Sequence, residues 1–220
     1  MQNVVIDALI PHYCCSCGEI GSIFCSCCKY DIISEPYAQC IICRKPTASN
    51  SLCATCPSPI KNAWCITEYS DSIKKLIEAY KFERSKAAHV ALADLLDEAL
   101  PQLPENVTIV PVPTVASHIR VRGYDHAALV AKRFARKRKI PYTNMLQRQT
   151  SDCQRGASRS RRHQQASKAF KCSRQTEGIY LLIDDITTTG ATLHYTAIAL
   201  YDAGASEVWA AVIARQPLEK

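Results

Sequence analysis

Two adjacent carboxylates, Asp184 and Asp185, follow an apolar run and precede a loop rich in threonine and glycine. The run 181–183 predicts a buried strand that delivers both acids to the carboxyl edge of a sheet, where α/β folds bind ligands. Beyond the acids, backbone N–H groups, threonine hydroxyls and the start of a helix expected from Ala191 can face one small anion. Gly190 lets the backbone approach that anion closely. Acids beside an anion cradle suit a ligand with vicinal hydroxyls and a phosphate, that is, a ribose 5-phosphate.

Other kinds of site fit this loop less well. The G-x-x-x-x-G-K-[ST] pattern of Walker-type nucleotide sites and the G-x-G-x-x-G pattern of dinucleotide folds are both absent. The alternative without chemistry is a core strand whose polar turn caps the next helix. Two acids, four threonines and a glycine within nine residues exceed what a cap needs. We therefore favour the ligand site.

A second grip for an anion is expected after the strand that ends in Val110-Pro111-Val112-Pro113-Thr114. Prolines fix the turn as the strand ends, and Arg120 and Arg122 can direct their guanidinium groups at phosphate oxygens. A solvated surface is the plainer reading of the two arginines. We expect Pro113, Thr114, Arg120 and Arg122 to form this second grip.

Cysteines are concentrated near the start of the chain. Eleven of the thirteen lie in residues 14–65, and eight of these form four C-x₂-C pairs. Two such pairs can hold one tetrahedral Zn²⁺ with no open position, so we expect two structural zinc ions rather than disulfides. Gaps of seven and nine residues favour sequential sites, although pairing of the first pair with the third stays open. The expected ligands are Cys14, Cys17, Cys25, Cys28, Cys40, Cys43, Cys53 and Cys56.

Length and composition limit the ways in which the chain can be organised into domains. Its 220 residues suit a small zinc-ribbon domain over 1–60 and an α/β domain over 61–220, with Pro57-Ser58-Pro59 near the boundary. We expect neither a transmembrane segment nor a secretory signal. The leftover cysteines are interpreted as buried or incidental thiols, which fits a reducing cytoplasm. They are Cys15, Cys27, Cys65, Cys153 and Cys172.

The positive charge is unevenly distributed. Residues 118–174 hold 16 Lys and Arg against two acids, which gives +14, whereas the remainder sums to −7. A basic middle on a mildly acidic body indicates a surface that faces anions, either pyrophosphate or nucleic acid. Aromatic residues are sparse in this stretch, so contacts to a nucleic-acid backbone are expected rather than base stacking.

Strands and helices are expected to alternate from residue 63 onward, which predicts an α/β fold with a mainly parallel, doubly wound sheet. The leucine, isoleucine and tyrosine positions of 73–80 fall at helical spacing, and the polar, basic segment 146–168 has no clear period. The expected strands are 63–69, 107–111, 170, 179–184 and 208–214. The expected helices are 71–80, 86–100, 125–139 and 191–202.

These motifs resemble a known group. The segment Asp184-Asp185-Ile186-Thr187-Thr188-Thr189-Gly190-Ala191-Thr192 is similar to the phosphoribosyl pyrophosphate (PRPP) loop of type I phosphoribosyltransferases. The resemblance implies that the two acids bind the ribose and that the loop encloses the 5-phosphate. The position of Thr187 is often aliphatic in that group. A VPVP strand end, an R-x-R-G-aromatic segment and four C-x₂-C pairs together resemble the ComF-type competence proteins.

The resemblance to ComF proteins extends over nearly the whole chain. Tyr80-Lys81-Phe82 is similar to a Lys-Phe signature after the first helix, while Tyr124-Asp125-His126 departs from the usual Phe-Asn-Gln. Further matches, Gln154, Ser158, Arg159, Arg162 and Ala169-Phe170, fall in a long loop that could close over the site and exclude water. The plainer reading of that loop is a solvated basic segment.

Two functions are compatible with these patterns. The first is a Mg²⁺-dependent phosphoribosyltransferase, or a PRPP binder, that serves DNA uptake, transformation or nucleotide metabolism, as the resemblance implies. The second is a PRPP sensor without catalysis, whose zinc ribbons and basic surface bind single-stranded DNA or a competence partner. Asp184 and Asp185 are assigned to the sugar, and His118, Asp125 and His126 are interpreted as surface residues rather than general bases. A third reading treats the cysteine-rich part as an architectural clamp only.

Overall fold

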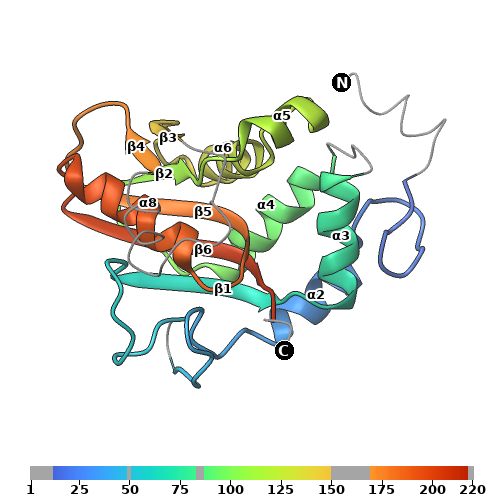
Figure 1. Cartoon of the computed structure of the whole chain (residues 1–220). Coiled ribbons are helices and arrows are strands. Elements are labelled where there is room, and N and C mark those ends of the chain that lie inside the picture. Colours follow the sequence, from blue (N-terminus) through green and yellow to red (C-terminus); the bar gives the residue numbers. More distant parts are fainter. Residues whose placement is uncertain (1–11, 49–50, 83–86, 150–168, 218–220) are drawn as a thin grey trace, which may run out of the picture.

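The structure is a computed structural model that describes residues 12–48, 51–82, 87–149 and 169–217. A parallel sheet with the strand order β1-β6-β5-β2 forms its centre (Figure 1). Because all four strands run in the same direction, their carboxyl ends meet along one edge of the sheet. The strands are β1 (Asn62–Glu68), β2 (Val107–Pro111), β5 (Ile179–Thr187) and β6 (Glu207–Arg215).

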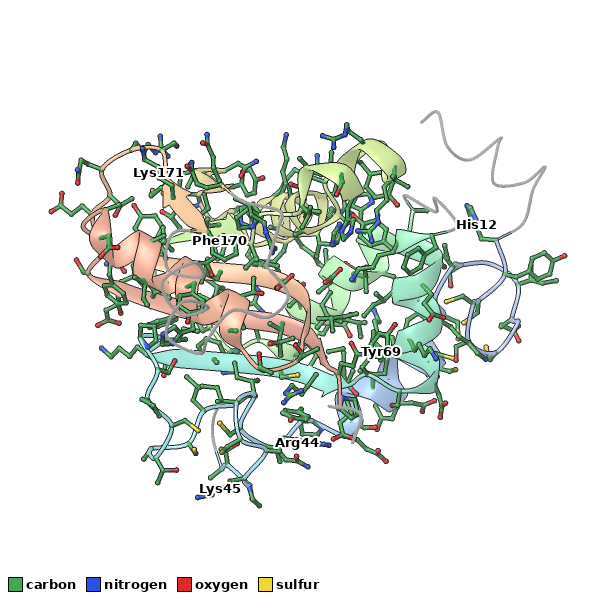
Figure 2. All side chains as sticks on the ribbon, viewed as in Figure 1. His12, Arg44, Lys45, Tyr69, Phe170 and Lys171 are labelled. Carbon is green, nitrogen blue, oxygen red and sulfur yellow. The ribbon has the colours of Figure 1, made fainter. Side chains whose placement is uncertain are left out.

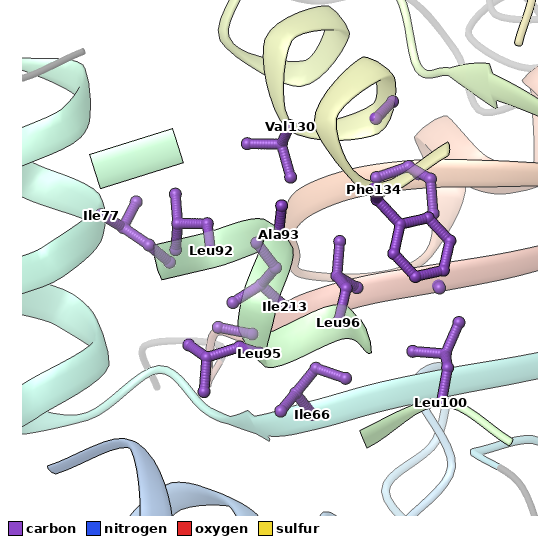
Figure 3. Close-up of a cluster of buried hydrophobic side chains, with 14 of the residues drawn as sticks. Ile66, Ile77, Leu92, Ala93, Leu95, Leu96, Leu100, Val130, Phe134 and Ile213 are labelled. Carbon is purple, nitrogen blue, oxygen red and sulfur yellow. The ribbon is translucent and has the colours of Figure 1, made fainter. Parts of the chain in front are cut away.

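Both faces of the sheet are buried, which explains the nearly continuous apolar runs of its strands. Leu181 and Ile183 of β5 belong to one buried cluster, whereas Leu182, between them in sequence, belongs to another. Helices α3 (Asp71–Lys81), α4 (Ala88–Ala99) and α6 (His126–Arg138) supply the first cluster, drawn in Figure 3. Helix α8 (Ala191–Asp202) covers the opposite face. The expected parallel, doubly wound sheet is therefore confirmed.

The amphipathic pattern of α3 shows why this helix forms where it does. Ile73, Leu76, Ile77 and Tyr80 recur every three or four residues and are all buried. This face packs toward α4, and the opposite face is polar. Tyr80 is the last residue of this buried face, and Lys81, directly after it, is the last residue of the helix.

The structure differs from expectation in three places. Strand β5 continues through both acids to Thr187, because the pairing with β6 runs on to Arg215. Phe170 lies outside the central sheet, in a two-stranded antiparallel sheet of β3 (Leu146–Arg148) and β4 (Phe170–Cys172). Helix α5 (Ala116–Arg122) occupies a segment expected to be a loop.

The cysteine-rich part packs on the sheet domain in two separate regions. Helix α2 (Ser26–Ser34) contacts α4 and β1, and Phe24 is buried with the α3 and α4 side chains. The second half lies along β1, where Ile41 and Ile60 join the cluster of the opposite face. In Figure 1 these regions are the blue chain beside α3 and the blue to cyan chain below β1. The boundary near residue 60 remains a prediction.

Of the helices within the described ranges, none combines the length and the apolarity needed to cross a bilayer.

Candidate sugar-phosphate site and cysteine groups

The eight cysteines of the four C-x₂-C pairs converge in two groups of four. Each group joins two successive pairs, and the ligand atoms of a group all lie within 4.8 Å of one another. The sequential arrangement favoured from the spacing is therefore the one that the fold brings together. The first group is Cys14, Cys17, Cys25 and Cys28, and the second is Cys40, Cys43, Cys53 and Cys56.

The spacing of the sulfur atoms fits a tetrahedral metal ion. An ion bound at ~2.3 Å to four thiolates separates their sulfurs by roughly 3.8 Å. The Sγ atoms of Cys14 and Cys28 are 3.8 Å apart, and those of Cys40 and Cys56 are 3.9 Å apart. Within the second group, a hydrogen bond with the Thr55 hydroxyl lowers the pKa of Cys53 to about 6, whereas burial raises the pKa of Cys56 above its usual range. Both groups therefore have the donors and the size of a structural zinc site.

Asp184 and Asp185 lie near the carboxyl end of β5 and have different surroundings. Asp184 is partly exposed, and one of its oxygens accepts the backbone N–H of Asp185 at 2.9 Å. Asp185 is buried, because alternation along the strand turns it toward the helices, and its Oδ1 accepts the N–H of Ile186 at 2.7 Å. Only the first acid is therefore open to a ligand.

A lysine and a histidine hold the buried acid. Lys81 Nζ lies 2.6 Å and His126 Nε2 lies 3.0 Å from Asp185 Oδ2. The side chain of Lys81 is 14% exposed, and that of His126 is 8% exposed. On its other side, His126 Nδ1 is 2.9 Å from a guanidinium nitrogen of Arg122, which also stacks over Phe82. These contacts connect the ends of α3, α5 and β5 with the start of α6.

The pKa values of the two acids are displaced in opposite directions. Burial and the neighbouring Asp185 carboxylate raise the pKa of Asp184 to about 8. Burial also opposes ionisation of Asp185, but Lys81 and His126 outweigh it and hold the pKa of that carboxyl well below its usual range. At neutral pH the pair therefore carries one proton, on Asp184, and one negative charge, on Asp185.

The threonine-rich loop has the form of an anion cradle. Gly190 has a φ of +76° and stands at the N-cap of α8, where it offers no side chain to cap the first amides of the helix. Thr188 and Thr189 are exposed, whereas Thr187 is buried as the last residue of β5. The helix start can thus direct N–H groups and hydroxyls at an anion. The cradle comprises Thr188, Thr189, Gly190, Ala191 and Thr192.

The expected second grip starts at the same edge of the sheet. The Val112 N–H donates to the Ile183 carbonyl at 2.9 Å, which carries the pairing of β2 and β5 up to the acids. Pro113 is buried, and the hydroxyl of Thr114 donates to Asp125 at 2.9 Å. Thr114 is therefore engaged by the residue that caps α6.

The two expected arginines differ in their surroundings. Arg122 is partly buried and joined to the acid pair through His126, while Arg120 is exposed at the end of α5. The loop residues Gln154, Ser158, Arg159 and Arg162 lie outside the described residues.

Sequence reasoning missed the lysine and the histidine beside Asp185. His126 was expected at the surface, but it is 7% exposed because it stands on the inner face of α6 beside Ala127 and Val130. An available signal was its place directly after the helix-capping Asp125. For Lys81, the signal was the Lys-Phe resemblance after the first helix, which did not say what the lysine contacts.

Comparisons with known proteins were made for both sequence and structure. The sequence matches no model of a protein family. The fold resembles glutamine PRPP amidotransferase from B. subtilis, solved with ADP and GMP, with a TM-score of 0.45 and 21% identity. The likeness covers 62% of this chain and 30% of that one. The same values hold for a structure described as the allosteric regulatory enzyme of purine biosynthesis.

Three curated proteins are similar in sequence over most of the chain. Competence protein F of Haemophilus influenzae is 29% identical over 65% of this chain and 68% of its own length. DNA utilization protein YhgH of Salmonella typhimurium is 27% identical, over 80% and 85%. Competence protein ComFC of Bacillus subtilis is 25% identical, over 75% and 72%. These matches agree with the resemblance to ComF proteins found from the motifs, and they support it over most of the chain.

Proposed function

We propose that the protein binds PRPP with Mg²⁺, transfers its ribose 5-phosphate to an acceptor, and thereby supports the uptake or handling of DNA. The observation that carries the proposal is a partly exposed carboxyl, Asp184, beside an uncapped helix start at Gly190 on one edge of a parallel sheet. One feature suits a sugar diol and the other suits a phosphate. The similarity to proteins named for competence and DNA utilization supports the cellular role.

Under this proposal the two acids have separate tasks. Asp184 accepts hydrogen bonds from the hydroxyls of the ribose, because its Oδ1 binds a backbone N–H and its other oxygen can face the ligand. Asp185 positions the site: it ties Lys81 and His126 to β5, and through His126 it orients Arg122. A protonated Asp184 accepts fewer hydrogen bonds than the carboxylate does. We therefore expect the affinity for PRPP to rise as the pH approaches and passes about 8.

The loop at Gly190 holds the 5-phosphate, and Pro113, Thr114, Arg120 and Arg122 face the pyrophosphate. Mg²⁺, bound mainly by the phosphates of the substrate, would neutralise the negative charge of the departing pyrophosphate. The guanidinium of Arg122 adds positive charge on the protein side of the same end. The two cysteine groups bind structural zinc, which stabilises the fold and performs no chemistry.

The test is calorimetric titration of the zinc-loaded protein with PRPP, with and without Mg²⁺, followed by phosphorus NMR of pyrophosphate release against a panel of nucleobases and amines. At pH 9, where Asp184 is ionised, replacement Asp184→Asn should weaken binding about 10- to 150-fold, the equivalent of losing a hydrogen bond to a charged group, ~1.5–3 kcal/mol. Asp202→Asn, an exposed position at the end of α8, is the matched control and should bind as the wild type. A wild-type protein that ignores PRPP would refute the proposal.

The second candidate is a PRPP sensor that binds single-stranded DNA. Lys132, Arg136 and Lys139 are exposed on or just after α6, which favours contact with a phosphate backbone. Part of the basic charge is already engaged, however, because Lys137 lies 2.5 Å from Asp94 of α4. Tight PRPP binding without pyrophosphate release, together with a steep salt dependence of DNA binding, would favour this candidate over the enzyme.

A further inference from the structure

The turn of the second cysteine group lies against the carboxyl edge of the sheet, where the proposed phosphate loop starts. We call residues 40–45 the second knuckle. It contains the metal-ligand positions Cys40 and Cys43 and ends in Arg44 and Lys45, both labelled in Figure 2. Three of its residues contact three different parts of that edge, so its position there is fixed from several sides.

The first contact joins the knuckle to the end of β6. Arg215 is 1% exposed, and its Nε donates to the carbonyl of Ile41 at 2.8 Å. A buried guanidinium needs such acceptors, because leaving its donors unpaired is costly. Arg215 also stands opposite Thr187 in the pairing of β6 with β5. The carbonyl of the knuckle thus engages the strand end beside Thr187, the residue directly before the phosphate loop.

The second contact is with the loop itself. A Cβ built on Gly190 would lie 3.3 Å from Cγ1 of Ile42, which shows that this side chain lies directly against the glycine. Ile42 is partly buried and packs on the cluster that includes Leu193 of α8. The side chain therefore closes one side of the turn that starts the helix.

The third contact is at the edge strand. Arg44 is 3.1 Å from Glu68, the last residue of β1, and Glu68 pairs in register with Arg215. This ion pair is exposed, so it adds little stability, but it fixes the direction in which the knuckle leaves the sheet. Ends of β1, β6 and the β5 loop are thus all contacted by one six-residue turn.

The first cysteine group makes no comparable contact within the described residues. Its turn meets α3 instead: the hydroxyls of Ser16 and Ser72 are 2.7 Å apart, and Lys75 donates to the Ser16 carbonyl at 3.2 Å. The two groups are alike in ligands and spacing but face different neighbours. This difference supplies an internal control for any role of the second knuckle.

We propose that the second knuckle is a positioning element of the phosphate loop, and that Ile42 holds the turn at Gly190 in the form that receives the 5-phosphate. The inference rests on the proposed function for its ligand. Metal at the second cysteine group would then support phosphate binding, because Ile41 and Ile42 lie between two of its ligands. Metal at the first group would support the fold only.

The test compares three variants of the zinc-loaded full chain. Ile42→Ala removes the contact, Ile42→Val keeps a Cγ1 methyl, and Ile20→Ala is the matched control at an exposed position of the first group. We expect Ile42→Ala to raise the Kd for PRPP about five- to tenfold while the protein keeps two zinc ions, measured by metal analysis. Ile42→Val and Ile20→Ala should bind as the wild type.

Amide hydrogen exchange supplies a readout that needs no ligand. Ile42→Ala should speed exchange at residues 188–192 and leave exchange in β2 and α4 unchanged. If the wild type binds no PRPP, the proposed function fails, yet the exchange result still decides whether the knuckle holds the loop. Unchanged affinity and unchanged exchange in Ile42→Ala would overturn the inference.

A double-mutant cycle sharpens the assignment to the pair Ile42 and Gly190. Gly190→Ala places a methyl group against Ile42 and strains a positive φ, so it should weaken PRPP binding. With Ile42→Ala in the background, the steric part of that loss should disappear, leaving a coupling of at least threefold in Kd. Additive effects of the two substitutions would show that the residues act independently, contrary to the proposal.

Discussion

Replacing each of the two adjacent acids by asparagine should affect stability in opposite directions. Asp185→Asn removes the charge that pairs with Lys81 and His126, both nearly buried. Removing one partner of a buried ion pair costs about 3–5 kcal/mol. Asparagine keeps the size of the side chain and an acceptor for the Ile186 amide, so we expect the lower end, about 3 kcal/mol. For a domain of this size that corresponds to a fall in Tm of roughly 6–12 °C.

Asp184→Asn should leave stability unchanged below about pH 4, raise it slightly at pH 5 and raise it by roughly 1–3 kcal/mol at pH 8, a range discounted for the partial exposure of the side chain. The folded pKa of Asp184 lies above its ordinary value, so the folded state holds the proton more tightly than the unfolded chain does. The stability gained from that proton is complete below about pH 4 and is lost as the pH rises through about 8. An amide has no proton to lose, and it removes this dependence.

The pH dependence of Asp185→Asn has the opposite sign. The folded pKa of Asp185 is depressed, so its contribution is present above pH ~4 and is lost as the pH falls toward the folded pKa. The penalty of the substitution should therefore shrink in acid.

Urea unfolding of zinc-loaded protein under reducing conditions, at pH 5, 7 and 8, measures these differences at constant m. Equal effects of the two substitutions, or a neutral Asp185→Asn, would refute the division of roles between the acids.

Three further predictions concern the loop, the metal and the helix pair. Gly190→Val should abolish PRPP binding measured by calorimetry, because it drives a branched side chain against Ile42 and places it at φ +76°, which displaces the loop; retained affinity would contradict the loop assignment. Cys40→Ser should lower the zinc content from two ions to one per chain and weaken PRPP binding, and an unchanged metal content would argue against the second site. Arg138→Gln should cost about 2–3 kcal/mol of unfolding free energy, because its guanidinium bonds Asp97 and the carbonyls that end α4. The exposed Arg136→Gln is its control in the same urea titration, and equal losses would refute the special role of Arg138.

Much of the fold could be predicted because its signals are local. The buried strands are recognisable in the sequence as apolar runs, and α3 and α6 are recognisable by their helical period. These elements therefore begin and end within a few residues of the expected positions. The cysteine pairs converge as their spacing indicated. Local patterns failed where pairing partners decide the outcome: β5 runs on to Thr187 because β6 continues beside it, and Phe170 pairs with Arg148 instead of joining the central sheet.

The candidate site was only partly predictable for the same reason. Asp184, Asp185 and Gly190 share one segment, so their juxtaposition follows from the chain itself. Lys81 and His126 come from segments far away in sequence, and no single-chain pattern specifies that both meet Asp185. The opposite displacement of the two pKa values depends on those partners, so the sequence could not distinguish the roles of the acids.

The way the cysteine-rich part is seated has a practical consequence for dissecting this protein. A fragment that begins at residue 61 would lose Phe24 and Ile32 from one apolar cluster and Ile41 from the other, and Arg215 would lose its acceptor. Such a truncated chain should be insoluble or partly unfolded. Attempts to study the sugar-phosphate half in isolation would then report on damaged protein, and point substitutions in the intact chain are the sounder route.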